Sequence, residues 1–291
     1  MVGRLAAAAM TPRMYPVATV ARAFWFDGIA NFGDGLTPWL LRRAGVIPIY
    51  STAEASNLVG VGSILEMLPE CYGGAVWGTG SLQGRPITLP DAKFLAVRGE
   101  LTRELVSAGT DTALGDPGIL ASRFMKRPRP RHQLGVVPHH MHEDDPLWAK
   151  AATLKGVKVI NVRRGPSAVL RDIAQCEAIL TTSLHGLITA DSFGIPVAWT
   201  HRKPDLWGGQ FKFHDYESAI TPAKPRFVEV ASVRDVMAIP RLAVPIDALL
   251  VRRRQDGLLE ALQSADLPRT NPAGALLHVR PSSSGSTARR T

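Results

Sequence analysis

The stretch AILTTSLHGLITADSFGIPVAWT, Ala178–Thr200, decides the fold. Its two ends, Ala178–Thr181 and Pro196–Thr200, predict short strands, and His185–Phe193 between them predicts a helix. Two strands joined by one helix are the repeating unit of parallel sheets. The stretch therefore predicts an α/β fold in which His185 lies where a strand ends and a helix begins.

The same alternation occurs earlier in the chain. Val17–Phe26 is rich in β-branched and aromatic residues and predicts a first strand. A glycine-rich loop, Asp27–Gly35, follows it, and the apolar spacing beyond this loop predicts a helix. Further short apolar runs suit parallel strands that are covered on both faces. These runs are Leu58–Val61, Ala75–Trp77 and Phe94–Val97.

The alternation resumes after a proline-rich basic segment, Phe124–His132, which predicts an interdomain linker. Beyond it the sequence predicts strands at Leu134–Val137 and Val157–Val162, a helix within Ser167–Ile179 and a terminal helix within Ile246–Leu262. We therefore expect two Rossmann-like, doubly wound domains facing a cleft, residues 16–126 and 133–266.

Two basic runs, at 123–131 and after Asp266, account for the net charge of +9. Such runs are typical of a linker and a disordered end, so residues 267–291 are predicted to form a disordered basic tail without a nucleic-acid partner. Weak attraction of this tail to the inner face of the plasma membrane is an alternative. No apolar stretch reaches the roughly 18 residues of a membrane helix. The two cysteines lack disulfide or metal spacing, which favours a cytoplasmic location.

Small and polar residues follow several predicted strands, where ligands bind in open α/β sheets. Glycine allows close backbone approach, and asparagine or aspartate can hydrogen bond at a helix start. Each segment could equally be a tight turn without a ligand. The candidates are Asn31, Gly33 and Asp34 after the first strand, then Gly62, Ser63 and Gly80.

Arg98 directly follows the predicted strand Phe94–Val97. At a strand end its guanidinium is placed to bind a carboxylate or phosphate through two N–H groups. The alternative is an ion pair with Glu100 or Glu104. Asp116 precedes a proline and is interpreted as a helix cap.

The motif SLHG gives the sharpest candidate site. Ser183, Leu184, His185 and Gly186 begin a helix whose first N–H groups face the predicted cleft and suit an anion. The imidazole of His185 suits proton transfer near neutral pH. The alternative is a histidine with a structural role only.

Further cationic residues lie on both sides of this motif. Lys212 lies in Gln210–Ala219, where cations alternate with aromatics and predict an edge strand, with or without a ligand. His139 comes just after a predicted strand and is expected to line the cleft. Adjacent residues on an extended loop cannot all converge on one ion, so no metal site is predicted from His139, His140 and His142.

Eight motifs taken in order resemble the polysaccharide pyruvyl transferase family, especially its exopolysaccharide ketal-pyruvate branch. The motifs span about Phe24 to Ile220 and are NFGDxLxPW, GxGSIL, VWGTG, VRGxLT, DPxIL, VPHH, SLHGLIxADxxxIP and FKFxDYxS. Phe193 and Phe213 stand where relatives often vary, and the basic tail has no family counterpart. The resemblance implies a two-domain fold of glycosyltransferase B type with phosphoenolpyruvate in the cleft. It also implies that Arg98, Leu184 and His185 correspond to donor-site positions.

The chemistry that the resemblance implies is transfer of a pyruvyl group to a saccharide, expected to be lipid-linked, as a ketal. Phosphoenolpyruvate carries a phosphate and a carboxylate, for which Arg98, His185 and Lys212 are suitable partners. We expect His185 to be the acid and Asp34 or His139 the base. Neither a cofactor nor a metal ion is expected.

Two other functions remain as alternatives. One is a nucleotide-sugar glycosyltransferase on the same fold, since fold alone does not fix chemistry. It would present an acidic residue to the ribose, and none is evident in Pro196–Gly209. The other is a nucleic-acid or anionic-membrane binding protein that depends on the basic tail.

Overall fold

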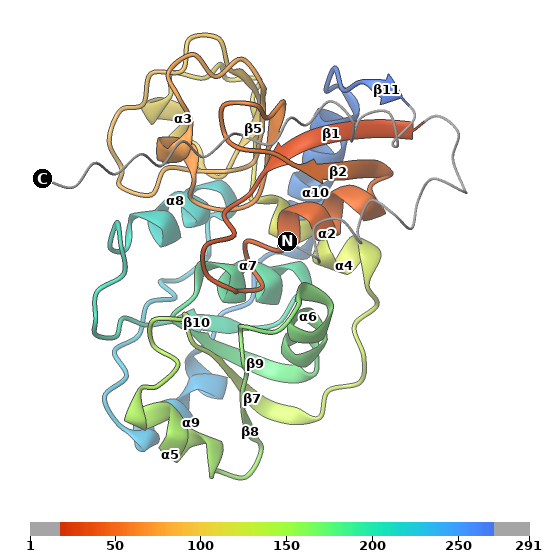
Figure 1. The fold of residues 1–291 in the computed structure, drawn as a ribbon. Helices are drawn as coiled ribbons and strands as arrows, with labels where there is room; N and C mark the ends of the chain where they lie inside the picture. Colours follow the sequence, from red (N-terminus) through yellow and green to blue (C-terminus); the bar gives the residue numbers. More distant parts are fainter. Residues whose placement is uncertain (1–17, 271–291) are drawn as a thin grey trace, which may run out of the picture.

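The computed structural model describes residues 18–270 and contains two sheets of largely parallel strands (Figure 1). The first sheet has the order β11-β1-β3-β4-β5-β6, with β2 also paired to β1. Its pairs are parallel except for β1 with β11. Its strands are β1 (Ala18–Phe24), β2 (Val46–Tyr50), β3 (Leu58–Val59), β4 (Ala75–Trp77), β5 (Lys93–Val97), β6 (Ala113–Leu114) and β11 (Arg269–Thr270).

The second sheet is entirely parallel and has the order β10-β9-β7-β8. Its strands are β7 (His132–Val137), β8 (Val157–Val159), β9 (Cys176–Thr181) and β10 (Val197–Trp199). The predicted α/β class is confirmed, and the arrangement is compatible with Rossmann-like units. The division into domains at 126 and 133 stays a prediction; strands β1 to β6 of the first sheet precede it and all strands of the second sheet follow it, but β11 of the first sheet also follows it.

Helices connect and cover the strands. Helix α7 lies between the two sheets in Figure 1 and packs against η2. The first half contains α2 (Leu36–Arg43), η1 (Leu65–Met67), α3 (Glu100–Leu105), η2 (Pro117–Leu120) and α4 (Ala121–Phe124). The second contains α5 (Pro146–Ala152), α6 (Pro166–Ala174), α7 (Leu184–Ser192), α8 (Phe211–Ile220), α9 (Val233–Leu242) and α10 (Ala248–Gln263). No helix within residues 18–270 is both long and apolar enough to cross a membrane.

The predicted strands and the predicted helix of the SLHG segment are confirmed, but β2 was not predicted. Its sequence, VIPIY, contains Pro48, which lacks the N–H that a central strand needs. The strand tolerates this proline because β1 is its one partner in the described sheet, so β2 is an edge strand.

The predicted edge strand at Gln210–Ala219 was wrong, because Phe211–Ile220 forms helix α8. The alternation of cations and aromatics suggested a strand, but the buried apolar residues Phe213, Tyr216 and Ile220 recur at helical spacing. Two residues apart on a helix do not share a face. Lys212 is accordingly buried, whereas His214 is exposed.

The end of the described chain returns to the first sheet. Helix α10 packs on β4, β5 and β6, and the carbonyl of its Leu258 accepts a hydrogen bond of 2.8 Å from the indole of Trp77. Residues 267–291 were predicted to be a disordered tail, yet β11, at residues 269–270, pairs with β1. The remainder of the predicted tail lies outside the described residues.

Gly99 lies where the first sheet meets α8. A Cβ placed on it would lie 1.7 Å from the backbone carbonyl oxygen of Asp215. Its backbone is extended, so the requirement for glycine here is one of space. The close approach brings α3 and α8 into contact.

We therefore expect Gly99→Ala to destabilise the protein by at least about 2 kcal/mol, because backbone atoms cannot yield to the added methyl group as side chains do. Gly165→Ala is the matched control, since nothing lies within 4 Å of its added Cβ. Urea unfolding of the two variants measures the difference. Equal midpoints for both variants and the unmodified protein would contradict the close approach.

Candidate active site

A cavity of about 890 Å³, including the solvent at its mouth, lies at the carboxyl ends of strands from both sheets. This is where parallel α/β sheets bind ligands. Its walls come from the loop after β1, from the region of η1, from the loop after β7, from the start of α7 and from α8 with the loop before it. The predicted site residues that line it are Asn31, Asp34, Ser63, His139, Ser183, Leu184, His185 and Lys212.

Five predicted residues do not line this cavity. Arg98 and the four glycines, Gly33, Gly62, Gly80 and Gly186, lie behind its walls. Three of the glycines allow close packing of a functional segment. A Cβ on Gly33 would lie 2.1 Å from Nδ1 of His185, and one on Gly80 would lie 2.4 Å from the guanidinium carbon of Arg98. A Cβ on Gly186 would lie 2.4 Å from Oγ1 of Thr181, at the end of β9.

Lys212 is buried on α8 and lines the cavity. Within residues 18–270 its ammonium group has no hydrogen bond or ion pair, and the ring of Phe213 is 6.0 Å away. Its pKa is lowered to about 8, mainly by burial and also by the charge of Arg98, while the charge of Asp34 opposes the shift. A buried cation of this kind needs an anionic partner, and the cavity is where one can bind.

The start of α7 adds N–H donors to the same cavity. Ser183, the N-cap residue, makes no side-chain cap, so the first turn keeps its N–H groups free of a capping side chain. The Gly186 N–H donates to the Ser183 carbonyl oxygen at 3.1 Å, whereas the N–H groups of Leu184 and His185 have no acceptor within the described residues. Together with the partial positive charge at a helix start, such groups favour an anion. SLHG begins a helix as predicted, and anion binding there stays a prediction.

His185 packs between the Gly33 backbone and Asp116. Its Nε2 is buried, has no hydrogen-bond partner in the described structure, and lies 3.8 Å from the carboxylate of Asp116. Its pKa is lowered to about 3, mainly by burial and also by the charges of Lys212 and Arg98. The imidazole is therefore neutral at pH 7.

Two carboxylates beside the cavity hold their protons more tightly than usual. Burial raises the pKa of Asp34 to about 6, against the effects of an Asn31 hydrogen bond and the Lys212 charge. Burial raises the pKa of Asp116 to about 7. The predicted cap is confirmed, because the Asp116 side chain accepts a hydrogen bond of 2.8 Å from the Gly118 N–H. Its nearness to His185 was not predicted.

The rings of the three histidines after β7 lie close together, with the centroid of His139 4.1 Å from that of His140 and 5.9 Å from that of His142, but the three side chains have different surroundings. His139 lines the cavity, and burial, then Lys212, lowers its pKa to about 2. His142 points elsewhere, with Nε2 2.8 Å from the Pro204 carbonyl oxygen and Nδ1 3.0 Å from Oγ1 of Thr182. Within residues 18–270 no group of three or more histidine, cysteine or acidic side chains is arranged to hold a metal ion.

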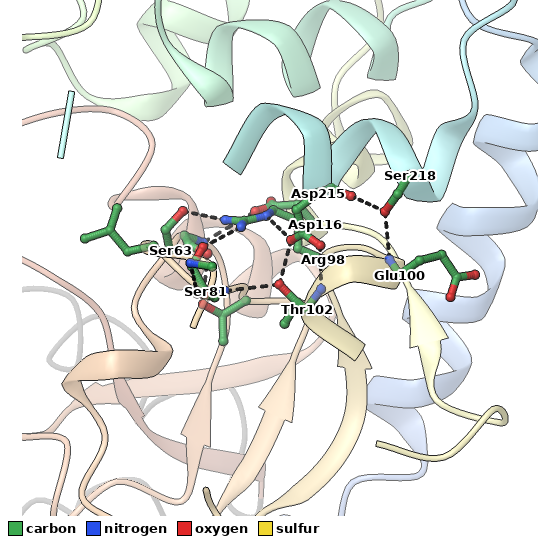
Figure 2. A network of polar contacts seen from close by, with 12 residues as sticks. Ser63, Ser81, Arg98, Glu100, Thr102, Asp116, Asp215 and Ser218 are labelled. Carbon is green, nitrogen blue, oxygen red and sulfur yellow. Dashed lines mark hydrogen bonds and ion pairs between the residues drawn. The ribbon is translucent and has the colours of Figure 1, made fainter. Parts of the chain in front are cut away.

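Arg98 lies at the carboxyl end of β5, and each of its three guanidinium nitrogens donates a hydrogen bond to a protein group (Figure 2). It is fully buried, donates from Nε to the Asp215 carboxylate at 2.7 Å, and donates from the other nitrogens to the Ser81 carbonyl and the Ser63 hydroxyl. Thr102 donates two further hydrogen bonds of 2.7 Å to Asp215. Through Ser63, which lines the cavity, Arg98 contacts the site indirectly.

The ion-pair alternative for Arg98 had the wrong partners, because Glu100 pairs with Arg103 and Asp215 takes Arg98. Asp215 was missed as a functional residue. It lies 117 positions away, on the segment predicted as a strand. A helical assignment of that segment would have placed Asp215 one turn from Lys212, on the same face.

The chain matches proteins that carry the same motifs. Residues 85–200 match the family described as polysaccharide pyruvyl transferase. The succinoglycan biosynthesis protein ExoV of Rhizobium meliloti (strain 1021) is 30% identical over 227 residues, covering 74% of this chain and 69% of ExoV. The chain belongs to the polysaccharide pyruvyl transferase family.

An uncharacterized protein of Acanthamoeba polyphaga mimivirus is 28% identical over 186 residues, covering 56% of this chain and 62% of that protein. No solved structure shows a significant match. The segment that matches the pyruvyl transferase family includes Arg98 and the SLHG motif, whereas Asp34 and Lys212 lie outside it. The cavity therefore joins the family segment to residues on either side of it.

We expect Asp215→Ala to destabilise this family member by about 3–5 kcal/mol, because it leaves the Arg98 charge buried without its partner. The double variant Arg98→Met/Asp215→Leu removes both charges and is expected to cost less. Urea unfolding measures both. Glu100→Ala, which breaks a partly exposed ion pair, is the control, with an expected cost of at most about 1 kcal/mol. A double variant no more stable than Asp215→Ala would contradict a buried-charge effect.

Proposed function

We propose that the cavity transfers the pyruvyl group of phosphoenolpyruvate to two hydroxyls of a saccharide, forming a ketal. Membership of the polysaccharide pyruvyl transferase family supports the reaction class. The observation that carries the proposal for this cavity is the ammonium group of Lys212, which belongs to a buried side chain at the cavity, beside the start of α7, and has no hydrogen bond or ion pair within residues 18–270. These groups match a small anion that carries both a phosphate and a carboxylate.

The donor would bind with its anionic groups on Lys212 and on the first N–H groups of α7. The hydroxyls of Ser63 and Ser183 also line this part of the cavity. Arg98 is proposed to act from behind, by fixing Ser63 and adding positive potential, since it is fully buried, does not line the cavity and donates to protein groups from each of its nitrogens. A charge-assisted hydrogen bond contributes about 1.5–3 kcal/mol, so two or three are sufficient to hold the donor.

In the reaction, the methylene carbon of the donor accepts a proton and C2 becomes cationic in character. The two saccharide oxygens bond to C2, and the C2–O bond to phosphate breaks. One hydroxyl proton is accounted for at the new methyl group and the other on the phosphate. His185 is proposed as the acid, and Asp34, with its pKa near 6, as the base. His139 is the other candidate base, but its pKa near 2 makes it a weak one.

The finer features rest on the family and on the name of its relative. We propose a glycosyltransferase B arrangement with the cavity between two Rossmann-like domains, consistent with the two sheets that line it. ExoV is named for succinoglycan biosynthesis, which supports an exopolysaccharide or its lipid-linked precursor as the acceptor here. Such an acceptor is accessible from the cytoplasmic face of a membrane.

Lys212→Met is expected to weaken phosphoenolpyruvate binding by about tenfold to a hundredfold, because it removes one charge-assisted contact and keeps most of the side-chain volume. Titration calorimetry measures the change in affinity. Lys224→Met, at an exposed position, is the matched control and should leave affinity unchanged. Equal affinity of the Lys212 variant and the unmodified protein would remove the ammonium group from the donor site.

Donor binding at pH 7 is also expected to take up as much as one proton. In the empty site His185 is neutral, since its pKa is about 3. The negative charges of bound phosphoenolpyruvate offset the charges of Lys212 and Arg98 and thereby raise the pKa of His185. Affinity for phosphoenolpyruvate should therefore increase as the pH falls. Above about pH 8 the Lys212 ammonium loses its proton and affinity should decrease.

Calorimetry in two buffers of different ionisation enthalpy at one pH measures this uptake. His185→Gln keeps a polar side chain of similar size but cannot take the proton, so its binding heat should no longer depend on the buffer. Asp116→Asn and Asp34→Asn are the controls, because they remove the two carboxyl groups with raised pKa that could gain the proton in place of His185. Buffer-independent heats in the unmodified protein would contradict the proposed charging of His185.

A further inference from the structure

Trp207 is the largest exposed apolar side chain in the described structure, with 70% of its surface accessible. It lies at the cavity that contains Lys212 and His185. Proteins seldom expose a whole tryptophan without a partner for it, since tryptophan side chains carry much of the energy of binding surfaces. Neither the anion site nor the proposed proton transfers use this residue.

The loop that carries Trp207 is fixed on both sides of it. Leu206 is buried before it, and Gly208 follows with a positive φ of 73°. A Cβ on Gly208 would lie 1.9 Å from the carbonyl oxygen of Leu82, in the first half of the molecule. Arg202 also holds the loop, through a 2.6 Å ion pair with Asp145. The indole is therefore held outward by its backbone.

The surroundings of Trp207 have a mixed character. Met67 on η1 is the other exposed apolar side chain at the cavity, and Phe26 and Ile29 add apolar surface. Asn31 and His140 provide polar groups among them. A pyranose ring has the same division, with apolar C–H faces and a rim of hydroxyls. A flat indole suits the first and hydrogen-bonding side chains suit the second.

We propose that Trp207 is the stacking surface for a pyranose ring of the saccharide acceptor. The inference rests on the proposed function, because it assigns the mouth of the same cavity to the second substrate. Ketal formation needs two hydroxyls of one acceptor presented together to C2 of the donor. A ring held flat on the indole has one orientation of its plane, so its hydroxyl edge can point inward to the donor while its chain leaves through the mouth.

The test uses the whole chain labelled with ¹⁵N at its six tryptophan indoles. Methyl β-D-glucopyranoside and methyl β-D-galactopyranoside are titrated in turn, and the Trp207 resonance is identified by its loss in Trp207→Phe. We expect at least one glycoside to shift this resonance saturably. Trp207→Leu, which is apolar but not flat, should weaken glycoside binding roughly tenfold, as measured by ligand-observed NMR.

Leu249→Ala is the control, because Leu249 is also exposed, at 65%, and does not line the cavity. Phosphoenolpyruvate affinity should be the same in Trp207→Leu as in the unmodified protein, which separates this inference from the donor site. If the glycosides bind at Trp207 but phosphoenolpyruvate does not bind at all, the donor assignment fails and the saccharide surface stands.

The inference would be overturned if neither glycoside shifts the Trp207 resonance, or if Trp207→Leu binds both glycosides as well as the unmodified protein does. If 1-octanol shifts the resonance while both glycosides leave it unchanged, the inference also fails and the surface is assigned to a lipid chain. In an acceptor-dependent assay, the expected change for Trp207→Leu is a higher KM for the acceptor with an unchanged KM for phosphoenolpyruvate.

Discussion

The buried ion pair between Arg98 and Asp215 is the constraint on which the site depends. Arg98 comes from the end of a strand in the first sheet, and Asp215 comes from α8. The pair is fully desolvated, so it is favourable only because hydrogen bonds from Thr102 and to Ser63 and Ser81 satisfy the remaining groups. Since Lys212 lies one turn before Asp215, the same pair determines where the ammonium group enters the cavity. Helix α8 thus positions both Asp215, the ion-pair partner of Arg98, and Lys212, which lines the cavity.

Burial is the main cause of every large pKa shift around the cavity, and in each case it favours the neutral form. It acts on Lys212 and His185 as cations and on Asp34 and Asp116 as anions. Of these four groups, Lys212, with a pKa of about 8, keeps its charge at pH 7 despite burial, and a nearby negative charge would stabilise it.

Local patterns predicted much of this arrangement. The strands around 178–200 and the helix after Ser183 follow from short apolar runs and from spacing within one segment. Contacts between distant segments could not be read in this way: the partner of Arg98 lies on α8, where alternating aromatics imitated a strand. The position of Trp207 at the cavity could not be predicted either, because it depends on where its loop lies in the folded chain. Contacts such as that of Arg98 with Asp215 could not be predicted because they join distant segments, whereas the strand and helix of a single short segment could.

Because α10 and β11 return to the first sheet, the second sheet lies between two parts of the chain that both pack with the first sheet. The chain leaves the first sheet after α4 and comes back to it before α10, so residues 132–244 are held at both ends. In topological terms the second sheet is an insertion within the first unit. Two connections allow rotation about the line that joins them but oppose rotation about any other axis. Any opening of the cavity would then be a rotation about this line. Such a rotation lets substrates enter while the groups on the two sides of the cavity stay aligned along the line.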